Sequence, residues 1–219
     1  MKAPSVGPRA VLAGVAGFYA VGLAGHLIAG TRSLMLGATP WFLLAAGAAV
    51  LLAAVRGTSV PSWLLWLVPM YGVAFALEAV GVATGLVFGR YHYSTVLGSL
   101  VLGVPPVIGW NWVLVVLGAH MAVRRLLPGM PELLTVLVVG LACVGFDLLL
   151  EPVAAGLGYW VWDTGAVPLQ NYAAWGLIAA AGSWWAGRLR NLPAAPVLGW
   201  YALVQAVFFA VLGAAGVRA

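Results

Sequence analysis

Three carboxyl side chains lie inside or at the edge of long apolar stretches of this sequence, namely Glu78, Asp147 and Glu151. A charged side chain costs ~2.5–3.5 kcal/mol at the centre of a membrane helix, and such residues usually mark functional sites. Asp147 and Glu151 are four residues apart, so they share one face of a helix. Two carboxyl groups so close in apolar surroundings resist double ionisation, which keeps one of them protonated. We therefore predict an acid–base site with Asp147, Glu151 and Glu78 as catalytic residues, one delivering a proton and another steering a water molecule.

The same pattern has a structural alternative, an ion pair between the acidic face and Arg90, which lies in the connection after the span that carries Glu78. Glu132 needs no functional explanation. It follows Pro131 in the first turn of an expected helix, where the helix dipole favours a carboxylate.

Other polar side chains are expected to lie at the same depth in the membrane as the carboxyl groups. His26 lies late in its span, and Asn111 and Asn171 lie early in theirs, so all three can support a site with the acidic residues. His120 falls at the opposite end of its span, and we expect it to be structural.

Aromatic residues accompany the acidic ones. His92 lies between Tyr91 and Tyr93, where it can relay a proton or orient a carboxylate, or simply act as a hydrogen-bonded partner. Tryptophans flank the acidic face and can stabilise a cation through their π-faces. These tryptophans are Trp110, Trp112, Trp160, Trp162 and Trp175.

Chemistry that depends on a metal or a cofactor has little support. Cys143 is the single cysteine, no two histidines have metal-ligand spacing, and the sequence has no phosphate loop, dinucleotide fingerprint or serine-hydrolase motif. We predict no metal site and no cofactor.

The composition identifies the elements that must position these groups. Of 219 residues, 64% are hydrophobic and only 7% are charged, whereas soluble domains have ~25% charged residues. The chain is therefore expected to be an all-α, polytopic membrane protein, and a secreted enzyme or a cytoplasmic Rossmann enzyme is excluded. The ten basic residues are scattered, so a nucleic-acid partner is not expected and the lipid bilayer is.

At ~20 residues per crossing, the length allows about seven spans in a single membrane domain over residues 1–219. The apolar runs place them near 10–30, 40–55, 62–87, 100–123, 132–151, 167–187 and 197–215. The first run is too long for a signal peptide, so we expect it to be a retained helix. Positive charge favours a cytoplasmic N-terminus in a prokaryotic cell membrane, because one side then holds most basic residues. That side has Lys2, Arg9, Arg56, Arg124, Arg125, Arg188 and Arg190, and the other has Arg32, Arg90 and Arg218.

An ordered set of short motifs extends over about residues 78–176. It comprises Gly89-Arg90-Tyr91-His92-Tyr93, Leu97-Gly98, Gly103-Val104-Pro105, Trp110, Asp147 with Glu151-Pro152, Gly158-Tyr159-Trp160-Val161-Trp162, Val167-Pro168-Leu169, Asn171 and Trp175. In this set the chain resembles the bacterial and archaeal carotenoid biosynthesis membrane proteins of the CruF type.

The resemblance implies a hydratase that adds water across a terminal double bond of lycopene, γ-carotene or a bacterioruberin precursor, without a cofactor. Such a reaction protonates the alkene to a tertiary cation, which water then captures, so it needs a shielded acid, a cation-stabilising wall and a positioned water. Two alternatives stay open at this point: a non-catalytic carotenoid-binding or assembly protein, and a small proton-coupled transporter that uses the three acids as a relay.

Overall fold

A computed structural model describes residues 7–56, 60–189, 192 and 195–217 of the chain. Lys2, Arg190 and Arg218, which contributed to the predicted orientation, lie outside the described residues. Seven helices and two short strands make up the regular structure of the described part. The helices are α1 (Pro8–Leu27), α2 (Arg32–Ala54), α3 (Val60–Thr84), α4 (Pro106–Leu126), α5 (Glu132–Gly156), α6 (Leu169–Arg188) and α7 (Pro196–Ala214), and the strands are β1 (Tyr91–Tyr93) and β2 (Trp160–Trp162).

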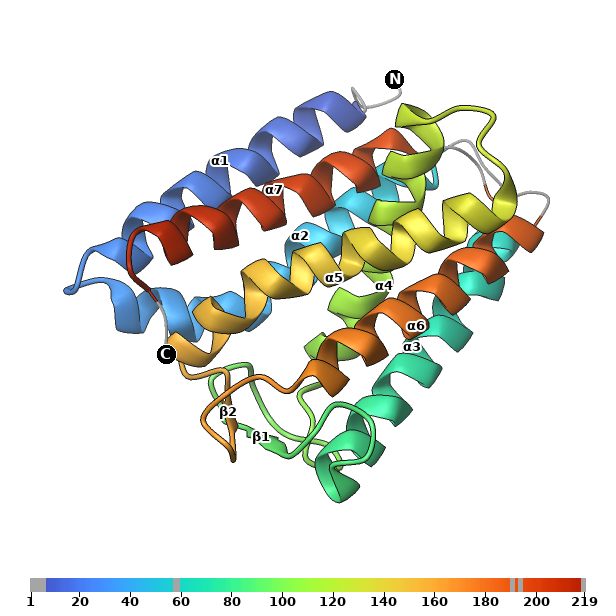
Figure 1. Ribbon diagram of the computed structural model, residues 1–219. Coiled ribbons are helices and arrows are strands. Elements are labelled where there is room, and N and C mark those ends of the chain that lie inside the picture. Colours follow the sequence, from blue (N-terminus) through green and yellow to red (C-terminus); the bar gives the residue numbers. More distant parts are fainter. Residues whose placement is uncertain (1–6, 57–59, 190–191, 193–194, 218–219) are drawn as a thin grey trace.

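The helices form an all-α bundle in which successive helices run in opposite directions (Figure 1). Three of them begin with a proline in the first turn, at Pro8, Pro106 and Pro196, where a missing N–H costs nothing. The predicted seven-helix arrangement is confirmed. The predicted bounds of α4 and α5 were wrong: α4 begins at Pro106 rather than near residue 100, because Val101 and Val104 pair in a turn before it, and α5 continues past 151 to Gly156.

The second helix is longer than its prediction of 40–55, because it begins at Arg32 and continues through Pro40. A proline inside a helix removes one backbone hydrogen bond. Here the Leu36 carbonyl oxygen loses its backbone donor, and in the same turn the Thr39 hydroxyl donates to the Met35 carbonyl oxygen at 2.8 Å.

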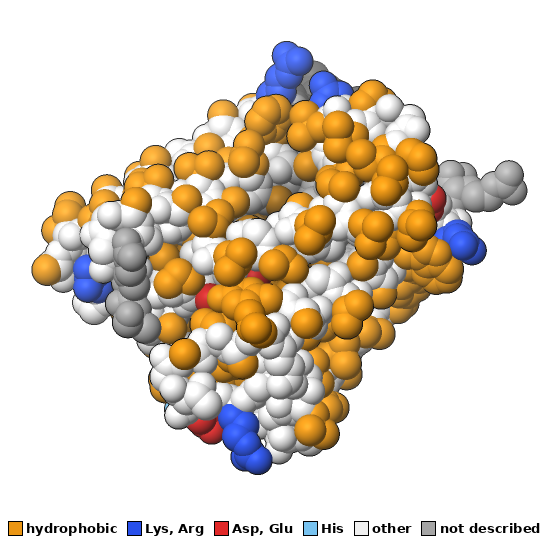
Figure 2. Space-filling view, in the orientation of Figure 1, with side chains coloured by type: hydrophobic (Ala, Val, Ile, Leu, Met, Phe, Trp, Pro, Cys, Tyr) orange, Lys and Arg blue, Asp and Glu red, His pale blue; other side chains and the backbone are white. Residues whose placement is uncertain are grey.

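Six of the helices described are long and apolar enough to cross a membrane. The seventh, α6, is 20 residues long but more polar, and it packs along α5. The two backbones approach closely where a Cβ atom on Gly140 would lie 2.9 Å from the Gly176 carbonyl oxygen. The face in Figure 2 is mostly hydrophobic, with Lys and Arg side chains at its periphery, as a multi-pass membrane protein requires.

Helix α4 lies at the centre of the bundle. Residues Val113 to Leu117 are all at most 1% exposed, so this helix is covered on every side. A helix that is apolar all round is typical of such a buried position. Asn111 and Trp112 lie one to two turns from its start and therefore face other helices rather than lipid.

Strands β1 and β2 pair antiparallel, with Tyr91 opposite Trp162 and Tyr93 opposite Trp160. They lie at one end of the bundle, beside the C-terminal ends of α3 and α5 and the N-terminal end of α6 (Figure 1). Side chains alternate along a strand, so His92 and Val161 point outward while the four aromatic residues are buried. We did not predict this ribbon, and its inward face forms one wall of the cavity described next.

Candidate active site

A cavity of about 60 Å³ lies between the helices at the ribbon end of the bundle. Five helices, α3 to α7, each contribute one polar side chain to its wall. In chain order these are Glu78, Asn111, Glu151, Asn171 and Gln205. Aromatic side chains form most of the remaining wall, and they include Phe88, Tyr91, Tyr93, Trp112, Tyr159, Trp160, Trp162, Trp175 and Phe209.

Glu78 is 4% exposed and accepts three hydrogen bonds. The hydroxyls of Tyr91 and Tyr93 donate to its Oε2 at 2.5 and 2.8 Å, and the Trp112 indole donates to its Oε1 at 2.7 Å. Burial, followed by the charge of Glu78, raises the pKa of both tyrosines, so their hydroxyls keep their protons and remain donors. These three donors fix the position of both oxygens of the Glu78 carboxyl group.

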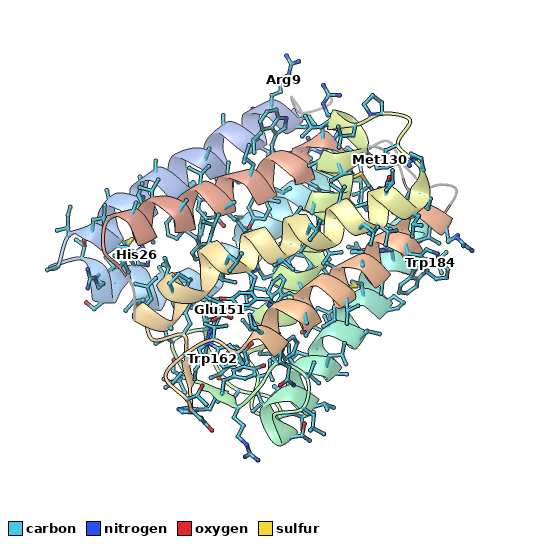
Figure 3. All side chains as sticks on the ribbon, viewed as in Figure 1. Arg9, His26, Met130, Glu151, Trp162 and Trp184 are labelled. Carbon is cyan, nitrogen blue, oxygen red and sulfur yellow. The ribbon has the colours of Figure 1, made fainter. Side chains whose placement is uncertain are left out.

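Glu151 is held in the same way by the other strand. The indole N–H groups of Trp160 and Trp162 both donate to its Oε2, at 2.9 and 2.8 Å. Figure 3 shows Glu151 and Trp162 close together at the C-terminal end of α5. The period of two along β2 accounts for this geometry, because it points both indoles to the same side.

Asp147 lies one turn before Glu151 and is fully buried, but it is not part of the cavity wall. Asn171 connects the two acids. Its Nδ2 donates to Asp147 Oδ2 at 2.5 Å and contacts Glu151 Oε1 at 3.5 Å. Asp147 and Glu151 thus share one face of α5, as predicted. Glu151 lines the cavity, whereas Asp147 does not and is bound by Asn171.

The acidic cluster has no cationic partner among the residues described. The ion pairs there are His92 with Asp163, on the outward side of the ribbon, and Arg124 with Glu132, and Arg90 is exposed. The alternative of an ion pair between the acidic face and Arg90 is therefore wrong for this structure. Without a positive counter-charge, three carboxyl groups in one buried region favour at least one bound proton.

Stacked and crossed rings enclose the carboxyl groups. Trp112 and Trp175 stack with centroids 3.8 Å apart and an interplanar angle of 22°. Across the ribbon, the ring centroids of Tyr91 and Trp162 lie 4.9 Å apart, and those of Tyr93 and Trp160 lie 5.7 Å apart. Such π-faces attract a cation while they exclude bulk water.

The structure places several predicted residues outside this cavity. His92 lies on the outward face of the ribbon with its side chain 64% exposed, and Arg90 beside it is exposed, so neither touches the carboxyl groups. Trp110 packs against Gly47 of α2. His26 lines a separate cavity. His120, predicted to be structural, is buried 3.0 Å from the Ser183 hydroxyl.

Gln205 is the polar lining residue that the sequence did not predict; apolar ones such as Phe88 and Phe209 were also not predicted. Gln205 is 1% exposed on α7, and its Nε2 has no hydrogen-bond partner in the described residues. The signal was present, because Gln205 is the one amide side chain in the last apolar run, but nothing local connects it with residues more than fifty positions earlier.

Comparison with known proteins supports the resemblance suggested by the motifs. Residues 38–216 match the family described as "Carotenoid biosynthesis protein". Over 117 residues the chain is 37% identical to the bisanhydrobacterioruberin hydratase of Haloarcula japonica. The aligned region covers 51% of this chain and 40% of that relative. The chain thus matches less than half the length of this curated relative, and no solved structure matches it. The family match spans most of the sequence, including every residue of the cavity wall, and the chain therefore belongs to the carotenoid biosynthesis protein family.

Proposed function

We propose that this protein is a cofactor-independent hydratase, which adds water to a terminal double bond of an acyclic or monocyclic carotenoid. The observation that carries the proposal is the set of buried carboxyl groups, two of them on the wall of an aromatic cavity inside a membrane helix bundle. The name of the Haloarcula relative supports hydration as the reaction class. Lycopene, γ-carotene and bisanhydrobacterioruberin are the substrates to test.

Glu151 is the proposed proton donor. It lines the cavity, both indole bonds go to its Oε2, and its Oε1 has only the long contact to Asn171. In the first step the O–H bond of the Glu151 carboxyl breaks, and the π electrons of the alkene form a C–H bond at the less substituted carbon. A tertiary cation and a carboxylate result. Asp147 lies one turn away from Glu151. Because two adjacent buried carboxylates repel each other, the pair of acids retains one proton before the reaction.

Glu78 has a different proposed role. With three donors already bound, it stands as a fixed negative charge opposite the forming cation, and the faces of Trp112 and Trp175 add to this stabilisation. Charges fixed before the reaction lower the barrier because they need no reorganisation.

The water molecule has a proposed position between two amides. Asn111 Oδ1 and Gln205 Nε2 are buried without hydrogen-bond partners in the described chain, and both residues line the cavity. One acceptor and one donor are what a water needs to be held with a lone pair free for attack. Its oxygen then bonds to the tertiary carbon and its proton returns to the carboxylate pair, so the net change is addition of one water.

The test is expression in bacteria that accumulate lycopene, γ-carotene or bisanhydrobacterioruberin, with mass spectrometry of the extracted pigments. We expect a new carotenoid heavier by one or two waters. Glu151→Gln should abolish it, whereas the matched variant Glu132→Gln, at the opposite end of α5, should retain it.

Product from Glu151→Gln at the parental level would refute the proton-donor assignment. Folded protein that leaves all three pigments unchanged would refute the hydratase. Pigment that copurifies unaltered with that protein would then favour a carotenoid-binding protein.

A further inference from the structure

A second cavity, of about 200 Å³, lies between α1, α2 and α7. Its wall is almost entirely apolar and rich in aromatic rings, including Tyr19, Phe42 and Phe208. It adjoins the first cavity, because Leu43, Tyr159 and Phe209 belong to both walls.

The second cavity opens sideways. Phe18 and Val21 of α1 line it and are also 67% and 64% exposed on the outside of the bundle. In a membrane-spanning helix such exposed apolar residues face lipid. A molecule in the bilayer can therefore enter or leave this cavity without crossing water.

One polar atom in this wall has no hydrogen-bond partner. His26 is 4% exposed, and its Nδ1 lies 2.7 Å from the Gly22 carbonyl oxygen. A carbonyl only accepts, so Nδ1 carries the hydrogen and donates it. The ring is neutral, since an imidazolium in these apolar surroundings would lack a counter-charge. Nε2 therefore presents a buried lone pair, and none of the described residues donates to it.

The chemistry of the wall narrows the ligand. A trapped water needs two to four polar partners. Beside His26 the wall has the Tyr19, Thr39 and Tyr159 side chains, and the hydroxyls of Tyr19 and Thr39 already donate to Tyr201 and to the Met35 carbonyl oxygen. A plain hydrocarbon would fill the space but leave the lone pair unsatisfied. A hydroxyl group on a long apolar chain satisfies both, because its O–H can donate to the unpaired His26 Nε2 while the chain contacts the rings.

We propose that the cavity between α1, α2 and α7 binds the hydroxylated end of a linear isoprenoid, with His26 Nε2 accepting a hydrogen bond from the hydroxyl. The assignment of this alcohol as product rests on the proposed function, because hydration in the first cavity creates such a group. The product end then passes Tyr159 and Phe209 into the second cavity on its way to the lipid. Figure 3 shows His26 and Glu151 toward the same end of the bundle.

The direct test is the nitrogen-15 NMR spectrum of histidine-labelled protein in nanodiscs. The chain has three histidines, so the His26 signals are identified by their loss in His26→Phe. The probes are geranyllinalool, a linear isoprenoid tertiary alcohol, and the dehydrated hydrocarbon of the same skeleton. We expect the alcohol to move the Nε2 resonance of His26 upfield, as a hydrogen bond to the lone pair does, while His92 and His120 stay in place. The hydrocarbon should leave all three unchanged.

A matching loss of affinity is expected in His26→Phe, which fills the space but removes the acceptor. It should bind the alcohol roughly tenfold more weakly, the effect of one hydrogen bond, and bind the hydrocarbon as well as the parent protein does. An equal response of His26 to both probes, or none to the alcohol at saturation, would overturn the proposal.

The two proposals fail separately. Glu151→Gln should abolish hydration yet leave the response of His26 to the alcohol intact. A protein that hydrates a carotenoid without this response refutes the alcohol site alone, and a protein with the response but no hydration refutes the hydratase alone.

Discussion

The bond between Asn171 and Asp147 offers a sharp test of how the buried acids are stabilised. Asn171 Nδ2 is the donor to Asp147 Oδ2, and Asp147 Oδ1 has no hydrogen-bond partner in the described residues. Asn171→Leu keeps the size of the side chain but removes this donor. Asp147, which is fully buried, is then left with neither oxygen satisfied.

The magnitude follows from that loss. A buried polar group left unpaired costs ~1–3 kcal/mol, and more if it is charged. We take about 2 kcal/mol for Asn171→Leu, which corresponds to a roughly 30-fold increase in the population that opens around α5. In Asp147→Leu/Asn171→Leu both partners are apolar, so most of this cost should disappear, because replacing both groups of a pair can be nearly neutral.

Cys143 provides the assay. It is the one cysteine of the chain, it is fully buried, and it lies one turn before Asp147 on α5. Its rate of labelling by a thiol-reactive fluorophore in nanodiscs therefore reports opening of this helix when reclosing is faster than labelling. We expect labelling to accelerate roughly 30-fold in Asn171→Leu and to return to within a few-fold of the parental rate in the double variant.

The matched control is Asn111→Leu, which removes another cavity-lining asparagine but leaves the bond to Asp147 in place. It should leave the labelling rate of Cys143 well below that of Asn171→Leu, because the bond between Asn171 and Asp147 stays in place. Labelling of Asn171→Leu at the parental rate would refute the reasoning. So would a double variant whose acceleration equals the combined effect of the two single changes, since that would mean that the two side chains do not stabilise each other.

Three further outcomes are expected. Tyr91→Phe should lower hydration roughly 10- to 100-fold at unchanged protein level, because it removes a charge-assisted hydrogen bond of ~1.5–3 kcal/mol from Glu78; a rate within twofold of the parent would contradict the role of Glu78. His92→Gln should keep parental turnover in the same pigment assay, because His92 points away from the cavity, and a large loss would instead restore the proton-relay hypothesis. Gly140→Val should abolish folded protein in detergent extracts, because its Cβ would lie 2.9 Å from the Gly176 carbonyl oxygen, whereas Gly145→Ala on the same helix, with open space around it, should be recovered normally.

Much of this arrangement could be predicted from the sequence, because local signals fix it. Continuous apolar runs of about twenty residues have few structural solutions in a bilayer other than a helix. The four-residue spacing of Asp147 and Glu151 requires a shared face on any helix, and Asn171 beside them follows from the alternating direction of the spans. The approximate depth of Glu78 followed from the same alternation.

The remaining features depend on contacts between distant positions. Nothing near Tyr91 indicates that Trp162 will be its strand partner, since three-residue strands have almost no propensity signal. Gln205 becomes part of the site only because α7 packs beside α4 and α5. The sequence spacing also gives no reason to distinguish Asp147 from Glu151. The structure distinguishes them, because Glu151 lines the cavity while Asp147 is bound by Asn171 and does not line it.

The ribbon explains how two carboxyl groups on different helices keep a fixed relative position. Strand β1 follows α3 and donates two hydroxyls to Glu78 on that helix, while β2 follows α5 and donates two indole N–H groups to Glu151 on that one. Each strand thus binds the carboxyl group of the helix before it, and the pairing of the strands joins the two halves. Because all four donors belong to one paired unit, a change that opens the ribbon disturbs both carboxyl groups together. Effects of such changes on the proposed hydration should therefore be less than additive, since the first one already removes the positioning on which both acids depend.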